Sequence, residues 1–182
     1  LRIVGEEEVV FDWTKDKCEA LDIPDLPARA FRDEQGNVQL IAAHYINYRF
    51  IGPNLSDIKR DCNPIMKSAS LQDPSLYSYH QWLSSFYTED GKTIYAFIHN
   101  EEYGSKAYVP CTGAFDGDQS CLYNAITLAI STDGGKSYNP AAEPPANLIA
   151  SSPYPFVAGA GPYGFFNPSN IIKGNDGYYY VY

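Results

Sequence analysis

Two carboxylates, Asp25 and Glu101, have a sequence context suited to proton transfer. Asp25 is flanked by Pro24 and Pro27, which hold an otherwise apolar segment extended. Glu101 follows the apolar run Tyr95–Ile98, and burial beside such a run raises the pKa of a carboxyl group towards the range of a general acid. A pair of carboxylates facing one pocket can hydrolyse a glycosidic bond. We expect Asp25 as base or nucleophile and Glu101 as acid.

Each of these carboxylates also has a simpler interpretation. Aspartates in loops commonly accept hydrogen bonds from nearby backbone N–H groups, so Asp25 can be a capping residue. Adjacent glutamates such as Glu101 and Glu102 are usually solvated, and Glu102 is the alternative candidate for the acid.

Four hairpins are predicted to position these groups. Each has a short apolar strand, a polar turn ending in glycine and a second strand, and Asp-Gly or Asn-Gly turns are strong hairpin signals. The turn glycines are separated by 55, about 43 and about 43 residues, a spacing typical of four-stranded propeller blades. The alternative is a β-sandwich, whose strands recur every ~8–12 residues. The predicted hairpins span 28–43, 82–99, 125–139 and 169–182, around Gly36, Gly91, Gly134 (or Gly135) and Gly177.

We therefore expect an all-β chain that forms a partial β-propeller of four-stranded blades. The 182 residues suffice for about three complete blades and the first hairpin of a fourth. The approximate units are 1–47, 48–104, 105–150 and 151–182. A closed propeller usually has four or more blades, so the remaining ones are expected from a longer chain, a processed partner chain or an oligomer.

The innermost strand of a propeller blade begins at the central axis, so residues at its start line the central pocket. Counting eleven residues back from the turn glycines reaches Asp25, His80, Tyr123 or Asn124, and Phe166, and counting eight forward reaches His44 and His99. Polar groups can pair with sugar hydroxyls and aromatic rings can stack on sugar faces, although core packing is the commoner role of aromatic residues. Arg29 falls on the same strand face as Asp25 and is expected to pair with it. The predicted substrate-binding residues are Arg29, His80, Trp82, His99, Asn124 and Asn167.

The third hairpin contains a motif that resembles a known family signature. Residues 131–138, Ser-Thr-Asp-Gly-Gly-Lys-Ser-Tyr, are similar to the Asp-box, S-x-D-x-G-x-[TS]-[WFY], of sialidases and other propellers. In this motif Asp133 is expected to accept backbone N–H bonds, Gly135 to adopt a conformation that other residues avoid, and Tyr138 to pack beneath the turn. The resemblance implies that the turn lies away from the active site.

The wider pattern resembles the five-bladed propeller glycosidases, such as arabinanase, levansucrase and invertase-like enzymes. Ile23-Pro24-Asp25 is similar to their first-blade aspartate segment, and 167–173 followed by 176–180 is similar to their repeated blade start. The resemblance implies a glycoside hydrolase acting on carbohydrate. The alternatives are a non-catalytic, lectin-like propeller and a protein-interaction scaffold, because one fold serves many functions.

The four cysteines show no zinc-type spacing and allow three pairings. We favour Cys111–Cys121, which closes a loop rich in Gly and Asp, together with Cys18–Cys62; free thiols are the alternative. Disulfides indicate an oxidising compartment, so a secreted, periplasmic or other extracellular protein is expected.

Composition excludes several classes of partner. The net charge is −9, and Lys59-Arg60 is the only adjacent basic pair, which argues against nucleic acid as a partner. No apolar stretch approaches 18 residues, so no membrane-spanning helix is expected. The sequence has no cofactor-binding or metal-ligand motif, and we expect neither a cofactor nor a metal.

Overall fold

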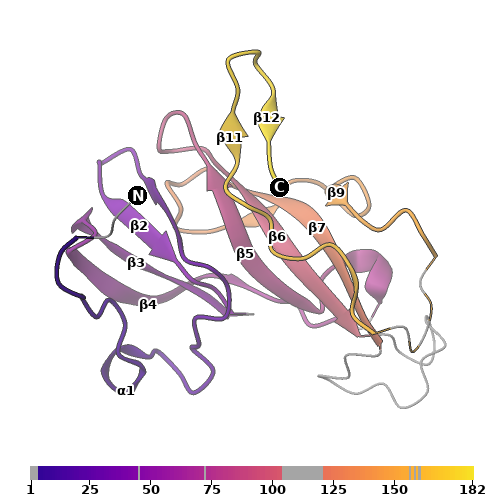
Figure 1. Ribbon diagram of the computed structural model, residues 1–182, viewed down its shortest axis with the longest axis horizontal. Coiled ribbons are helices and arrows are strands. Elements are labelled where there is room, and N and C mark those ends of the chain that lie inside the picture. Colours follow the sequence, from indigo (N-terminus) through magenta and orange to yellow (C-terminus); the bar gives the residue numbers. More distant parts are fainter. Residues whose placement is uncertain are drawn as a thin grey trace.

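The computed structural model describes residues 4–44, 46–71, 73–103, 121–155, 157, 159 and 161–182. These residues form two β-sheets and a separate two-stranded hairpin, which confirms the all-β expectation (Figure 1). The helices of the described chain are short: α1 (Trp13–Asp16) and a 3-10 turn at Pro74–Leu76. None of the helices in these ranges has the length and apolar character needed to cross a membrane.

The first sheet, sheet A, is a four-stranded antiparallel meander. It consists of β1 (Arg29–Arg32), β2 (Val38–Ile41), β3 (Ile46–Asn54) and β4 (Asp57–Lys67), paired in chain order. Gly36 has a φ of +83° in the β1–β2 turn, a conformation that glycine adopts without steric cost. β4 ends the strand order of sheet A, and an edge strand tolerates Pro64, which has no N–H to donate.

The second sheet, sheet B, is centred on three long antiparallel strands. These are β5 (His80–Tyr87), β6 (Ile94–Tyr103) and β7 (Leu122–Ser131). The short strands β8 (Asn139–Pro140) and β9 (Leu148–Ala150) pair antiparallel with β7, and β10 (Tyr163–Gly164) pairs parallel with it. β5 is buried along nearly its whole length because it packs against sheet A.

The remaining hairpin, β11 (Ile172–Lys173) and β12 (Tyr179–Tyr180), projects away from both sheets (Figure 1). All four predicted hairpins are present, as β1–β2, β5–β6, β7–β8 and β11–β12. The predicted turn glycines all have positive φ. None of the sheets formed by the described residues closes on itself.

An apolar core and buried hydrogen bonds fix the two sheets relative to each other. Trp82, Leu83 and Phe86 of β5 pack in one cluster with Ile41 and Ile65 of sheet A. Burial of such side chains stabilises the fold by about 1.5–3 kcal/mol each.

Buried polar side chains fix the position of one sheet relative to the other. Asn47 of β3 donates to the carbonyl of Gln81 (3.0 Å) and accepts from the N–H of Leu83 (2.7 Å). Arg49 donates to the carbonyl of Gly135 at 2.8 Å, which joins sheet A to the β7–β8 turn. A shift between the sheets would leave these buried groups unpaired, at a cost of about 1–3 kcal/mol each.

The β7–β8 turn has the hydrogen bonds expected of Asp133. Its Oδ1 accepts from the N–H groups of Lys136 and Ser137, both at 3.0 Å. Gly135 has a φ of +82°, and Tyr138 is buried against Phe86 with ring centroids 5.9 Å apart. This turn lies beside the β5–β6 turn, since the N–H of Gly134 donates to the carbonyl of Lys92. We call this end of sheet B, formed by residues 88–93 and 132–138, the turn end.

The segment before β1, residues 17–28, is fastened to β4, and we call it the Asp25 arm. The predicted Cys18–Cys62 disulfide is confirmed. Beside it the guanidinium of Arg60 pairs with the carboxylate of Asp22, and both side chains are less than one-tenth exposed. Cys111 lies outside the described residues, so the pair Cys111–Cys121 stays a prediction.

Removing the disulfide is expected to loosen this arm. The bond closes a loop with a sequence separation of 44, for which chain entropy gives a stabilisation of about 4 kcal/mol as an upper figure. A Cys18→Ser/Cys62→Ser variant should therefore lose about 2–4 kcal/mol in free energy of unfolding, measured by urea denaturation. An unchanged denaturation midpoint would show that Arg60 and Asp22 hold the arm without the covalent link.

Candidate functional site

All three histidines of the chain pack their rings against one tryptophan, Trp82. The ring centroids of His44, His80 and His99 lie 5.8, 5.6 and 5.5 Å from that of Trp82. His44 follows β2, whereas His80 and His99 lie on β5 and β6, so both sheets contribute. We call these four residues together with Glu101 the histidine cluster.

Trp82 is the floor of the cluster. Only 3% of it is exposed and it belongs to the apolar core, so the predicted stacking ring orients imidazoles instead of presenting an open face. Phe166 supplies the exposed ring: it is 45% exposed and lies 6.0 Å from the ring of His99. A ring supported on one side and open on the other can receive the apolar face of a ligand.

Glu101 shares one face of β6 with His99 and Tyr103, because alternate residues of a strand point the same way. Its Oε1 lies 3.2 Å from Nε2 of His99, and the hydroxyl of Tyr103 donates to its Oε2 at 3.2 Å. Nδ1 of His99 is buried and has no hydrogen-bond partner among the described residues. The predicted acid is thus held by two side chains, one of which can exchange a proton with it.

The predicted residues His80, Glu101 and Asn124 form one row across β5, β6 and β7. His80 and Asn124 each face Glu101 in the strand register. Asn124 is fully buried and donates to the carbonyl of Tyr163 at 3.4 Å. Its Oδ1 is buried without a hydrogen-bond partner in the described part of the chain, which leaves one acceptor beside the carboxylate.

Asp25 reaches the same cluster from the Asp25 arm. Its N–H donates to the carbonyl of Ala43 at 3.3 Å, which places it next to His44, and the residue is exposed. Burial and the nearby His80 lower the pKa of His44, while the charges of Asp25, Glu19 and Glu101 oppose that lowering. Three carboxylates therefore act on this imidazole, and Asp25 and Glu101 are two of them.

Arg29 and Asn167 lie beside Phe166 and Pro168. The guanidinium of Arg29 donates to the carbonyls of Ala28 (3.3 Å) and Pro168 (3.4 Å) and forms no ion pair with Asp25, so the predicted pairing is wrong. Nε of Arg29 is buried without a hydrogen-bond partner among the described residues. Asn167 is exposed with a φ of +23°, a strained region that asparagine tolerates better than most residues.

Glu102, the alternative acid, points to the other face of β6. It is 2% exposed and accepts the N–H of Tyr79 at 3.0 Å. Burial raises its pKa to about 8, against the opposing effect of the N–H groups of Tyr79 and Ser78. Glu102 is therefore mostly protonated at neutral pH. Glu101 remains the candidate acid because it, and not Glu102, lies on the face of β6 that carries His99 and Tyr103.

Glu102 should make folding pH-dependent. Its folded pKa of about 8 lies above the ordinary 4.5, so its contribution to stability is complete below pH 4.5 and is lost as the pH rises through 8. The loss amounts to about 1.4 kcal/mol per pH unit within this window. Glu102→Gln should keep the bond to Tyr79 without ionising. In thermal melts from pH 4.5 to 8.5, the melting temperature of the variant should then rise relative to that of the native protein as the pH rises.

The surface substitution Glu143→Gln is the matched control, because Glu143 is exposed. It should follow the native protein across the whole range. Parallel curves for the native protein and Glu102→Gln would show that Glu102 ionises in the folded state with its ordinary pKa.

Sequence reasoning gave His44 little weight and missed Tyr79 and Tyr103. Tyr79 stacks on His80 with centroids 4.5 Å apart, and Tyr103 lies 6.0 Å from His80. The missed signal is the period of two in residues 99, 101 and 103, all of which can hydrogen-bond. Among the residues that the structure describes, no group of three or more His, Cys, Asp or Glu side chains could hold a metal ion.

Comparisons with protein families, with curated proteins and with solved structures each found no match. The geometry of the site therefore carries the functional argument on its own.

Proposed function

We propose that the protein is a carbohydrate-active propeller that hydrolyses glycosidic bonds, with the histidine cluster and Asp25 as its active site. The observation that carries this proposal is that two carboxylates, one on the Asp25 arm and one on β6, lie at either end of one chain of contacts. The N–H of Asp25 donates to the carbonyl of Ala43, the residue before His44. The rings of His44 and His99 both pack on Trp82. His99 in turn contacts the carboxylate of Glu101. Paired carboxylates flanking one site are the machinery of most glycosidases.

The two carboxylates have environments suited to different roles. Asp25 is exposed at the end of its arm, where a ligand can reach it, and acts as base or nucleophile. Glu101 is enclosed by His99 and Tyr103 and acts as the acid. The contact between Glu101 and His99, 3.2 Å from Oε1 to Nε2, positions the carboxyl group.

The residues around this pair suit a sugar. Phe166 offers an open aromatic ring. Asn167 follows it in the chain, and Arg29 donates to the carbonyl of the next residue, Pro168. Sugar hydroxyls both donate and accept, and they can donate to the carboxylates of the exposed Asp25 and the partly exposed Glu101.

The propeller is part of the proposal. Sheet A has the four antiparallel strands in chain order that a blade needs, and β5–β6–β7 begins a second unit of the same kind. The Asp133 turn lies at the turn end of sheet B, away from the histidine cluster, as the resemblance to Asp-box propellers implies. The Cys18–Cys62 disulfide is consistent with the proposed extracellular location.

A panel of aryl glycosides and neutral oligosaccharides tests the function. Turnover by the native protein, measured as aryl-alcohol or reducing-sugar release, and its loss in an Asp25→Asn/Glu101→Gln double variant would support the hydrolase. Saturable sugar binding by calorimetry with no turnover in either protein would overturn it in favour of a lectin-like propeller. The absence of both binding and turnover across the panel would overturn both sugar functions.

A further inference from the structure

A cavity lies towards the turn end of sheet B, next to the histidine cluster along β6. Its volume of about 450 Å³ falls in the range of small-molecule sites. The cavity lies on the same face of β6 as the histidine cluster, since Phe97 lines it and is two strand residues, about 7 Å, from His99. The C-terminal segment passes between the cavity and the cluster, held to β5 where the hydroxyl of Ser85 donates to the carbonyl of Ser169 at 2.8 Å.

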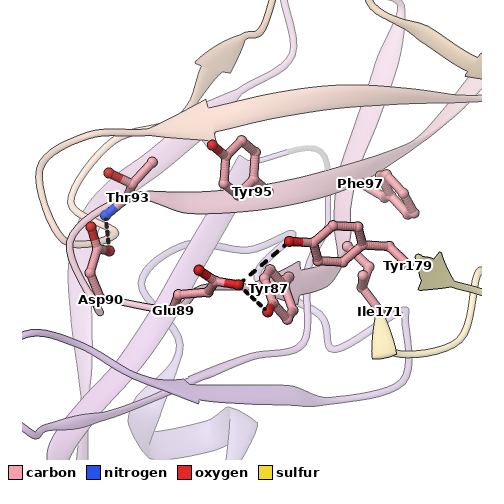
Figure 2. A pocket seen from close by; sticks show the side chains of 8 residues that line it. All are labelled: Tyr87, Glu89, Asp90, Thr93, Tyr95, Phe97, Ile171 and Tyr179. Atoms are coloured by element: carbon pink, nitrogen blue, oxygen red, sulfur yellow. Dashed lines mark hydrogen bonds between the residues drawn. The ribbon is translucent and has the colours of Figure 1, made fainter. Parts of the chain in front are cut away.

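The walls of this cavity are mainly aromatic (Figure 2). Tyr95 and Phe97 share one face of β6, and Tyr179 and Ile171 approach from the C-terminal hairpin and the residue before it. Tyr87 packs edge-on against Tyr179 with centroids 5.0 Å apart. Tyr95 is 42% exposed, so its ring is open to a ligand.

The polar end of the cavity combines acceptors with donors. Oε1 of Glu89 accepts the hydroxyl of Tyr87 at 3.0 Å and lies 3.5 Å from that of Tyr179 (Figure 2). The ammonium of Lys173 also pairs with this oxygen and lies over the ring of Tyr179. No hydrogen bond from a described residue reaches the other oxygen, Oε2.

These features select the chemistry of the ligand. The Glu89–Lys173 pair is electrically neutral, so a charged ligand would have to displace one partner from the other. The nearby carboxylate of Asp90 already accepts the N–H groups of Lys92 and Thr93. A neutral ring with hydroxyl groups satisfies both halves of the cavity, because its hydroxyls donate and accept while its apolar face stacks on the rings.

We propose that the cavity between β5–β6 and the β11–β12 hairpin is a second, non-catalytic binding site for a neutral carbohydrate. The site needs no reaction at the histidine cluster and goes beyond the proposed hydrolysis. Ligand bound here contacts the β11–β12 hairpin directly. Two-stranded hairpins are marginally stable on their own, so occupancy also orders this hairpin.

The test uses the Asp25→Asn/Glu101→Gln protein, in which hydrolysis at the first site is disabled. Maltotriose, xylotriose, arabinotriose and 1-kestose are titrated by calorimetry, with tetraethylammonium as a cationic comparison. At least one trisaccharide is expected to bind, and Tyr95→Ala should weaken it about tenfold through loss of the stacking ring. Tyr178→Ala is the matched control, since Tyr178 is an exposed tyrosine of the β11–β12 hairpin and is not among the residues that line the cavity.

Hydrogen exchange locates the site independently of the variants. The bound trisaccharide should slow exchange at the amides of 171–180 and 87–97. The proposal is overturned if no trisaccharide binds, if Tyr95→Ala binds as tightly as its parent, if protection appears only around the histidine cluster, or if tetraethylammonium binds more tightly than every sugar. Failure of hydrolysis by the native protein leaves this outcome unaffected, so the two proposals fail separately.

Discussion

Replacing Glu101 by glutamine is expected to lower turnover of an unactivated glycoside by about 10²–10⁴-fold, the usual contribution of a general acid. Glutamine keeps an oxygen for the hydroxyl of Tyr103 and cannot give a proton to the leaving oxygen. Binding of the same sugar, measured by calorimetry, should change little. The reaction to follow is release of reducing sugar from a natural oligosaccharide.

Substrates with different leaving groups distinguish the roles of the two carboxylates. A 2,4-dinitrophenyl leaving group departs without protonation, so Glu101→Gln should recover most of its activity on such a substrate. Asp25→Asn removes the proposed base or nucleophile, and its activity should stay low with every leaving group. Glu102→Gln is the matched control, because Glu102 lies on the opposite face of β6 and should leave turnover nearly unchanged.

Two results would reverse this assignment. If Glu102→Gln loses activity on natural substrates and regains it on dinitrophenyl glycosides, Glu102 is the acid. If Glu101→Gln is impaired equally on all leaving groups, Glu101 acts other than as a proton donor. The first pattern would move the acid to the other face of β6, and the second would give Glu101 a different role at the same site.

The second large effect is expected from Trp82→Ala, which should destabilise the protein by about 3–5 kcal/mol. Trp82 is 3% exposed in the core and supports His44, His80 and His99, so its removal leaves a cavity beneath all three rings. Denaturant unfolding measures the loss. Turnover should fall as well, measured where the variant is still folded.

The other tryptophan of the chain is the natural control. Trp13 in α1 is 42% exposed and contacts Lys17, so Trp13→Ala should cost much less than Trp82→Ala. Trp82→Phe keeps a ring in the core and should recover part of the stability. Equal losses for the Trp13 and Trp82 variants would show that the cluster is not built on Trp82.

Local turn chemistry explains how much of the fold could be predicted. The hairpins around Gly36, Gly91, Gly134 and Gly177 were predictable because each needs a positive φ at a fixed place in the chain. The bounds of β3 and β4 were not, because Pro53, Pro64 and alternating charges give them no apolar period. Their pairing depends instead on buried contacts with β2 and β5, which are long-range.

The candidate site was predictable in its residue types more than in its contacts. His80, Trp82, His99 and Glu101 lie together because β5 and β6 are neighbours in one hairpin. His44 and Asp25 join them through the docking of sheet A on β5, which no local pattern encodes. The choice between Glu101 and Glu102 depends on which face of β6 turns towards sheet A, and a one-residue change of register reverses it.

The nearest-neighbour pairing of sheet A has a consequence for the order of folding during synthesis. Every strand pair in sheet A, and the Cys18–Cys62 bond, joins residues that precede position 68, so these pairs can begin to form before β5 leaves the ribosome, and the buried contacts with β5 then complete them. Trp82, His80, His99 and Glu101 arrive afterwards and meet a surface that already presents Asp25 and His44. The residues of the candidate site therefore come together only when β5 and β6 dock on sheet A, and a nascent chain that stops short of this step lacks the completed candidate site.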